Sequence, residues 1–363
     1  MAEPRGAAEA GRAVKFLAAF LAAFTLAGVA YAAAIRIVDP YGEFGTGVFP
    51  PLEPDMRSEK MRLFRAYEAA GPPEGLILGS SRSMKVSPRA LERATGRRFF
   101  NFAVDNARAE DDLAIYRWVR AQGARLAVVV IGLDVEALHN DDRPEASLLA
   151  SEPLMRALGP EAPHGRGLLD PLREFGPVRT FKRYKDAFTI RALGDAVRSV
   201  GLSLRPASRP LPLMEFEPDG YLRYRRWERE RREGTFRFDQ DIERCLTKSQ
   251  ARFDGMTGLS ARRRAYLRQL VSEARSDGTR VIVWITSLHP LTTRYLAAHT
   301  AYPALLADTR AYEQALAGEE KVAVFDFSRP ESYEGTASGW YDCIHIDESN
   351  AERVTAALLG GRP

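Results

Sequence analysis

Several signatures that would identify a function are missing from this sequence of 363 residues. It has only two cysteines and five histidines, and none of them falls in zinc-finger spacing. His139, His164 and His299 do not form a ligand set with aspartate or cysteine, so we expect no metal. A Walker loop, a glycine-rich dinucleotide fingerprint and internal repeats are also missing, and we expect no cofactor.

An excess of one charge is missing as well. Lys and Arg together number 52 against 48 Asp and Glu, which gives a formal charge of +4. Both signs are mixed along most of the chain, so the composition does not indicate a nucleic-acid partner. With 45% hydrophobic residues the chain can bury a large core, as one big domain or two modest ones.

One long hydrophobic run is present at residues 16–35, where only Thr25 and Tyr31 are polar and no residue is charged. A helix of this length spans roughly 30 Å, the thickness of the hydrocarbon core of a bilayer. Because Arg5, Arg12 and Lys15 precede the run, the positive-inside rule keeps that end in the cytoplasm.

We therefore predict a cytoplasmic tail at 1–15, a transmembrane anchor at 16–35 and an extracytoplasmic, periplasmic remainder on the inner membrane. The alternative is a cleaved signal peptide, since "AGVAYAAA" offers small-residue cleavage sites. Both alternatives export the rest of the chain. In an oxidising compartment Cys245 and Cys343 could form one disulfide, or both could be small buried side chains.

Downstream of the run, the pattern predicts a three-layer α/β/α domain. Continuous apolar runs at 76–78, 99–103, 126–131, 281–286 and 322–327 are typical of a parallel sheet covered on both faces. Helical periodicity appears at 63–70, at 111–121 and at 260–275, where Ser260 is the expected N-cap and Gly278 the expected stop. We expect a linker or strap at 36–73 and the domain in two parts, 74–139 and 259–363.

Residues 140–258 interrupt this rhythm and are expected to form a cap-like insertion. They contain the basic stretch "YLRYRRWERERREG". Its glutamates allow pairing at i,i+4, which favours a solvated helix face. A surface for an anionic polymer or lipid headgroups is the alternative interpretation.

Side chains able to carry out chemistry follow each predicted strand, and ligands of open α/β sheets bind beyond those strand ends. Ser81 follows the first strand, and His289 follows the fourth. Asp342 and His345 lie in "YDCIHIDESNAERV", before the last helix. Serine needs an adjacent base to act as a nucleophile, and the base needs a partner that fixes its tautomer. The alternative for Ser81 is that it caps the following helix.

Together, "GSS" after the first strand, "FNFAVDN", an apolar strand ending in "IGLD" and a C-terminal "DxxH" resemble the SGNH (GDSL-like) hydrolase superfamily. Within this superfamily the chain most resembles the membrane-anchored extracytoplasmic members, which include DltD-type D-alanine transfer proteins and exopolysaccharide O-acetyltransferases. The resemblance covers roughly residues 74–135 and 280–359. It implies a flavodoxin-like sheet of about five strands and a Ser81, His345, Asp342 triad.

The resemblance also implies an oxyanion hole, where the chain departs from the family pattern. Asn106 stands at the approximate position of a glycine donor and Asp134 at that of an asparagine donor. An ionised carboxylate cannot donate a hydrogen bond, so we expect Asp134 to pair with Arg82 or Arg108. The expected donors are the Ser81 backbone N–H and the Asn106 amide, with Arg82 and His289 as further candidates for substrate contact. The alternatives are that Arg82 is a salt-bridge partner and that His289 packs the loop.

Two classes of function follow from the resemblance. The first is an anchored serine esterase or O-acyltransferase acting on a cell-surface polysaccharide or lipid-linked glycan. The second is an inactive SGNH-fold protein that binds polysaccharide or belongs to a glycan assembly or secretion complex. A weaker third possibility is a partner subunit of a membrane-bound acyl-donor transporter.

Overall fold

The computed structural model describes residues 5–41, 46, 48–49, 52, 55–159, 189–204 and 214–360. Much of the predicted linker and the middle of the predicted insertion lie outside these residues. The chain divides into two compact units, one of residues 1–55 with 164–210 and the other of 56–163 with 211–363. We describe each unit by itself.

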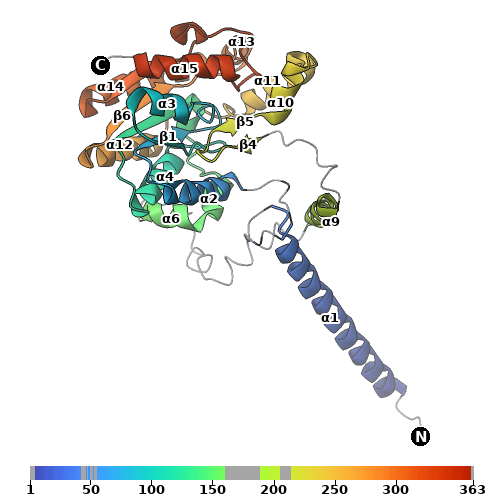
Figure 1. Cartoon of the computed structure of the whole chain (residues 1–363). Helices are drawn as coiled ribbons and strands as arrows, with labels where there is room; N and C mark the ends of the chain where they lie inside the picture. Colours follow the sequence, from blue (N-terminus) through green and yellow to red (C-terminus); the bar gives the residue numbers. More distant parts are fainter. Residues whose placement is uncertain are drawn as a thin grey trace. The chain divides into compact units, whose positions relative to one another are not determined.

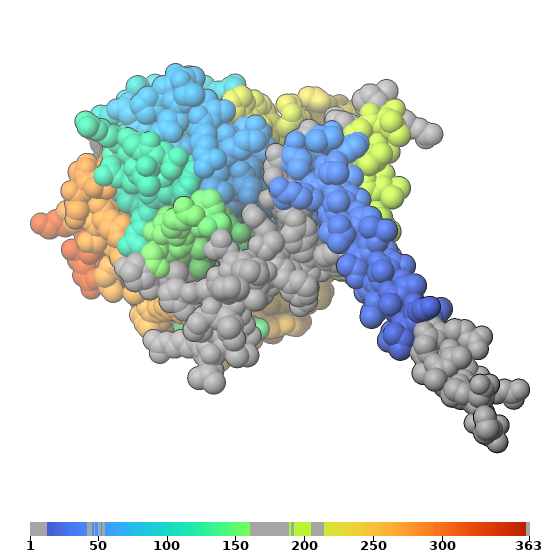
Figure 2. Space-filling model, turned by 90° about the horizontal axis from the view of Figure 1, so that it is seen from below, coloured from blue at the N-terminus to red at the C-terminus, as the bar shows by residue number. Residues whose placement is uncertain are grey.

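The first unit contains the hydrophobic run as a helix, α1 (Arg5–Val38), which extends beyond the predicted span on both sides. Within the described residues, this is the one helix long and apolar enough to cross a membrane, over Ala13–Val38 with a mean hydropathy of 2.0. Its large apolar side chains lie open to the surroundings along the rod (blue in Figure 2). The helix fits a membrane span or a signal sequence.

A second helix of this unit, α9 (Ile190–Leu204), packs against the end of α1. Ile35 of α1 and Ala192 of α9 are buried in the small apolar cluster between them. Just beyond α1, the Tyr41 hydroxyl donates to Asp195 Oδ2 at 2.8 Å. Part of the predicted insertion therefore belongs to the unit of the apolar helix.

The second unit is an α/β domain whose five parallel strands confirm the predicted sheet. The strands are β1 (Gly75–Gly79), β2 (Phe99–Asn101), β3 (Val128–Leu133), β6 (Arg280–Ile285) and β7 (Ala323–Asp326). They lie in the order β2-β1-β3-β6-β7, and each pair of neighbours is parallel. The sheet therefore gathers all five strand ends, and the loops that follow them, at one edge.

Helices cover both faces of this sheet (Figure 1). Leu76 and Leu78 of β1 face a core shared with α2 (Met56–Ala69), α4 (Ala109–Ala121) and α12 (Ala261–Ser276). Ile77 points to the opposite core, shared with α3 (Pro88–Thr95) and α15 (Glu348–Gly360). The alternation follows from the period of a strand, and burial on both faces explains why the strands are apolar throughout.

Shorter elements complete the second unit. They are η1 (Val135–Leu138), α5 (Ala146–Ala150), α6 (Glu152–Leu158), β4 (Glu215–Phe216), β5 (Leu222–Arg223), α10 (Arg225–Arg232), η4 (Phe238–Asp241), α11 (Ile242–Ala251), α13 (Pro290–His299), α14 (Tyr302–Glu320) and η5 (Pro330–Tyr333). The basic stretch forms β5 and α10. No residue of α10 is buried, and Arg226 pairs with Glu230 at i,i+4, as the solvated-face interpretation predicts.

Candidate active site

The turn after β1 is built around a glycine that no other residue could replace. Gly79 has φ of +119°, and a Cβ placed there would lie 2.5 Å from the Gly132 carbonyl oxygen of β3. Ser80 Oγ then accepts the backbone N–H of Arg82 at 3.2 Å, so the first serine of "GSS" shapes the turn. Ser81 does not cap the helix that follows, because the N-cap of α3 is Ser87, whose Oγ accepts Ala90 N–H at 3.2 Å.

Two buried side chains that the sequence did not single out hold this turn. Asn101, at the end of β2, donates from Nδ2 to the Ser83 carbonyl at 2.9 Å and to the Val86 carbonyl at 3.0 Å. Asp112, in the first turn of α4, accepts the Gly79 N–H at 2.9 Å. Burial raises the pKa of Asp112 well above its ordinary value. The sequence "FNF" in the second strand could have pointed to Asn101, because a polar side chain inside a buried strand requires hydrogen-bond partners.

The turn presents Ser81 to a histidine from near the far end of the chain. His345 Nε2 lies 2.9 Å from Ser81 Oγ, and His345 Nδ1 lies 2.8 Å from Asp342 Oδ2. The three predicted triad residues are thus joined by two consecutive hydrogen bonds. With Nδ1–H donating to the carboxylate, Nε2 is left to accept the serine proton, which is the arrangement that a general base requires.

The loop carrying Asp342 and His345 is held by its own backbone. Asp342 Oδ1 accepts the N–H groups of Ile344 at 2.8 Å and of His345 at 2.7 Å, while Tyr341 N–H donates to the His345 carbonyl at 2.8 Å. Burial would raise the pKa of Asp342, but His345 and these N–H groups lower it below its ordinary value. Asp342 is therefore an anion that orients the imidazole.

A disulfide between Cys343 and Cys245 ties the same loop to helix α11. Cys343 is fully buried, and its carbonyl accepts the Thr292 hydroxyl at 2.7 Å. The question that the sequence left open is thus answered in favour of the bridge. It joins the predicted insertion to the residue that separates Asp342 from Ile344.

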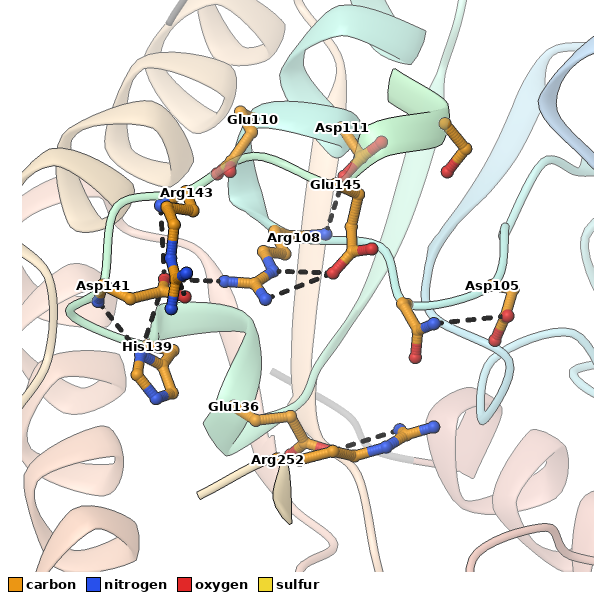
Figure 3. A network of polar contacts seen from close by, with 12 residues as sticks. Asp105, Arg108, Glu110, Asp111, Glu136, His139, Asp141, Arg143, Glu145 and Arg252 are labelled. Atoms are coloured by element: carbon orange, nitrogen blue, oxygen red, sulfur yellow. Dashed lines mark hydrogen bonds and ion pairs between the residues drawn. The ribbon is translucent and has the colours of Figure 1, made fainter. Parts of the chain in front are cut away.

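Asp134 lies in a buried cluster of charges, and the predicted pairing with Arg82 is observed. Its Oδ1 accepts the Thr286 hydroxyl at 2.5 Å and lies 3.4 Å from Arg82 Nη1. Arg82 also pairs with Glu136, and Arg252 lies 3.6 Å from Glu136 (Figure 3). Two carboxylates and two guanidinium groups balance here. Arg82 is 5% exposed and engaged in this cluster, so its contact with a substrate stays a prediction.

The alternative partner, Arg108, belongs to a different network. Figure 3 shows it between Asp141, at 2.9 Å from its Nη1, and Glu145, at 3.1 Å from its Nη2. Asn106 precedes it in the left-handed conformation, with φ of 49°, and donates from Nδ2 to Asp105 Oδ2 at 3.3 Å. Among the described residues, no acceptor binds the backbone N–H of Ser81 or of Asn106. Both N–H groups therefore remain candidates for the predicted oxyanion hole.

His289 is a structural residue. Its Nδ1 accepts the Leu291 N–H at 3.0 Å as the N-cap of α13, and its Nε2 donates to the Ala337 carbonyl at 3.1 Å. Burial lowers the pKa of His289, which matches this neutral tautomer. Both ring nitrogens are occupied, which argues against contact with substrate and supports the alternative that His289 packs the loop. Within the part of the chain that the structure describes, no group of three or more His, Cys, Asp or Glu could hold a metal ion.

Aromatic residues of the predicted insertion cover the triad. The Tyr224 ring lies 5.7 Å from the His345 ring and 5.2 Å from the Tyr341 ring, and Trp227 stacks on Tyr341 at 5.3 Å. From α10, Arg231 donates to the Trp340 carbonyl at 2.5 Å and pairs with Asp347. The predicted insertion therefore contributes side chains to the site, which the spacing of charges alone did not indicate.

Comparison of the sequence with protein-family models and with curated proteins finds no match.

Proposed function

We propose that this protein is a membrane-anchored, extracytoplasmic serine esterase or O-acyltransferase of the SGNH type. The observation that carries the proposal is the chain of hydrogen bonds from Asp342 through His345 to Ser81, at 2.8 and 2.9 Å. Two further features support it. The strand order is the flavodoxin-like one, and the three residues lie in loops at the edge where ligands of such sheets bind.

In the proposed reaction Ser81 Oγ attacks the acyl carbonyl carbon, and His345 Nε2 takes the serine proton. As the Oγ–C bond forms, the C=O π electrons move onto the oxygen, which the free N–H groups of Ser81 and Asn106 stabilise. The intermediate collapses by breaking the bond to the leaving oxygen, to which His345 returns the proton. Water or a sugar hydroxyl then attacks the acyl-enzyme by the same steps, giving hydrolysis or transfer.

The proposed location of the protein supports a class of substrate. The apolar helix at Ala13–Val38 fits a single span of the inner membrane, and the Cys245–Cys343 disulfide fits an oxidising compartment such as the periplasm. An anchored active site suits small acyl groups on a cell-surface polysaccharide or a lipid-linked glycan. A membrane-bound acyl-donor transporter is the partner that transfer from inside the cell would require.

One observation favours a second candidate function. The side chain at the position of the family's asparagine donor is Asp134, which is 2% exposed and paired with Arg82, so it gives the substrate oxygen no hydrogen bond. Loss of one oxyanion donor costs about 10²- to 10³-fold in rate. An SGNH-fold protein that binds polysaccharide without catalysis is therefore the competing proposal.

A fluorophosphonate serine probe separates the two candidates. Wild type is expected to be labelled, and Ser81→Ala is expected not to be. Ser83→Ala is the matched control, because Ser83 lies in the same turn and its buried hydroxyl has no hydrogen-bond partner among the described residues. This control should be labelled like wild type. An unlabelled wild type that binds acidic polysaccharide as well as Ser81→Ala does would favour the binding protein.

A further inference from the structure

The hydroxyl of Tyr224 is buried without a hydrogen-bond partner among the described residues. Tyr224 is only 2% exposed, and a buried tyrosine hydroxyl normally finds a partner because an unsatisfied polar group costs free energy. The residue is held firmly: its backbone N–H donates to Glu228 Oε1 at 3.1 Å, and its ring lies 4.8 Å from the ring of Trp227. The structure thus keeps an unsatisfied donor in a fixed position.

That position adjoins the proposed catalytic residues. The Tyr224 ring lies 5.7 Å from the His345 ring and packs with Met84, three residues after Ser81, and with Ala103, two residues before Asp105. Nearby, the backbone N–H of Leu222 donates to the Met84 carbonyl at 3.1 Å, which ties β5 to the turn of Ser81. The loops after β1 and β2 and the loop before α15 therefore all contact this side chain.

The charges around the hydroxyl keep it protonated. Burial raises the pKa of Tyr224 well above its ordinary value, and Asp342, Asp105 and Glu348 raise it further. The group is thus a neutral donor within the electrostatic reach of Asp342 of the triad and of Asp105, the neighbour of Asn106. A charge developing on a substrate oxygen near these carboxylates requires a hydrogen-bond donor, and Asp134 does not supply one.

A cation that lies over the Tyr224 ring does not fill this role. Lys85 Nζ lies 5.8 Å from the Tyr224 ring centroid, but it pairs with Glu348 and lies 3.5 Å from Glu228. Its charge is therefore already balanced by carboxylates of the structure. The Tyr224 hydroxyl therefore stays an unengaged side-chain donor next to the His345 ring, among the residues that the structure describes.

We propose that Tyr224 is a catalytic residue that contacts the substrate, its hydroxyl donating a hydrogen bond to the acyl carbonyl oxygen as that oxygen becomes an oxyanion. The proposal rests on the proposed function and adds to it a donor in place of the family's asparagine. The phenol keeps its proton throughout: the Oγ–C bond forms, the C=O π pair moves to the oxygen, and the Tyr224 O–H bond remains intact. The residue comes from the predicted insertion, which the resemblance to the SGNH superfamily does not cover.

The test uses Tyr224→Phe, which removes only the hydroxyl and keeps the ring against His345. With p-nitrophenyl acetate as the probe substrate, we expect kcat to fall about 10²- to 10³-fold with little change in KM, because the donor acts in the transition state. The rate of fluorophosphonate labelling should fall as well, since the phosphonyl oxygen occupies the same place. The melting temperature should stay the same or rise, because a buried unsatisfied group is removed.

Tyr221→Phe is the matched control, since it removes a phenol hydroxyl from the same hairpin. The Tyr221 ring contacts Lys85, whose Nζ lies 4.9 Å from its centroid, whereas the Tyr224 ring lies against His345. It should keep the wild-type kcat. If Tyr224→Phe stays within about threefold of wild type while wild type is labelled and active, the Tyr224 proposal is overturned and the serine enzyme stands. If wild type itself is neither labelled nor active, the proposed function fails and this proposal fails with it. A matching loss of kcat and of melting temperature would indicate a structural role and would also overturn it.

Discussion

Removal of the Cys245–Cys343 disulfide should lower both the stability of the domain and the activity of the site. The bridge spans 98 positions, and closing a loop of this length stabilises a fold by about 4.7 kcal/mol through the entropy of the unfolded chain. At about 2–4 °C for each kcal/mol in a domain of this size, the melting temperature should fall by roughly 9–19 °C.

The effect on activity has a separate cause. Cys343 lies between Asp342 and Ile344, whose N–H group binds Asp342 Oδ1, so the bridge fixes the loop that carries two triad residues. A displacement of about 1 Å in such a loop is enough to cost about 10²-fold in rate. We therefore expect kcat for p-nitrophenyl acetate to fall by about that factor in Cys245→Ala/Cys343→Ala, at a temperature where the variant remains folded.

The assay compares wild type with and without dithiothreitol and the double variant under both conditions. Reductant should bring wild type down to the level of the double variant and should leave the double variant unchanged. A wild type that is shown to be reduced by mass but keeps its melting temperature and its kcat would refute the reasoning. It would mean that the backbone hydrogen bonds of the loop hold the triad by themselves.

Three further predictions concern two single side chains and the N-terminal helix. Asp342→Asn should lower kcat by about 10⁴-fold with the fold retained, because the amide no longer favours the required His345 tautomer; steady-state kinetics and circular dichroism check this. Burial raises the pKa of Glu313 in α14 to about 9. The stability that comes from protonated Glu313 is therefore full below a pH of about 4.5, where the unfolded chain is protonated too. It declines as the pH rises from about 4.5 to about 9 and is lost above that. Glu313→Gln should remove this slope and exceed wild-type stability at pH 7 by about 3 kcal/mol in urea unfolding, whereas the exposed Glu319→Gln should not. Finally, the full-length protein should stay in carbonate-washed membranes with its N-terminal helix uncleaved by mass; a shortened soluble form would contradict the anchor.

The strands of the sheet and both ends of helix α12 could be predicted, because the local sequence patterns there agree with the fold. Continuous apolar runs matched all five strands, and Ser260 caps α12 by accepting the Arg263 N–H at 3.1 Å. Gly278 follows the end of this helix with φ of +77°, as expected of a stop. In these places short-range chemistry and tertiary packing favour the same structure.

The prediction was less successful where charged side chains are buried. A short helix was expected at 63–70, inside a linker, but α2 begins at Met56. Its first turns bury Arg57 against Asp111, 2.9 Å from Arg57 Nε to Oδ1, and Lys60 against the Asn101 carbonyl at 2.8 Å. Because arginine and lysine count as surface residues in a hydrophobic pattern, the pattern hid this part of the helix.

The residues of the candidate site also differ in how far the sequence could predict them. Ser81, Asp342 and His345 could be expected to lie together because they follow strands or precede the last helix at one edge of the sheet, and the structure joins them by two hydrogen bonds. Their catalytic role stays a prediction. Tyr224 was not found, because a tyrosine in a basic stretch has no distinguishing pattern, and only the fold brings it to His345. The insertion was expected to be one cap, but its residues contribute to both compact units.

Asp134→Asn distinguishes a site that has lost a donor from one that uses a different donor. If this aspartate weakens the proposed active site, replacing it by the asparagine expected from the SGNH resemblance should raise the rate. We expect no gain, because Asp134 Oδ1 accepts the Thr286 hydroxyl at 2.5 Å and its charge balances Arg82 in a buried cluster. In the Asp134→Asn variant, Arg82 keeps only Glu136 as a charged partner. The free energy of unfolding should therefore fall by up to about 3 kcal/mol, which lowers the melting temperature by roughly 6–12 °C. A variant that gains activity without losing stability would contradict this reasoning, since the position would then face the substrate and not the ion pairs.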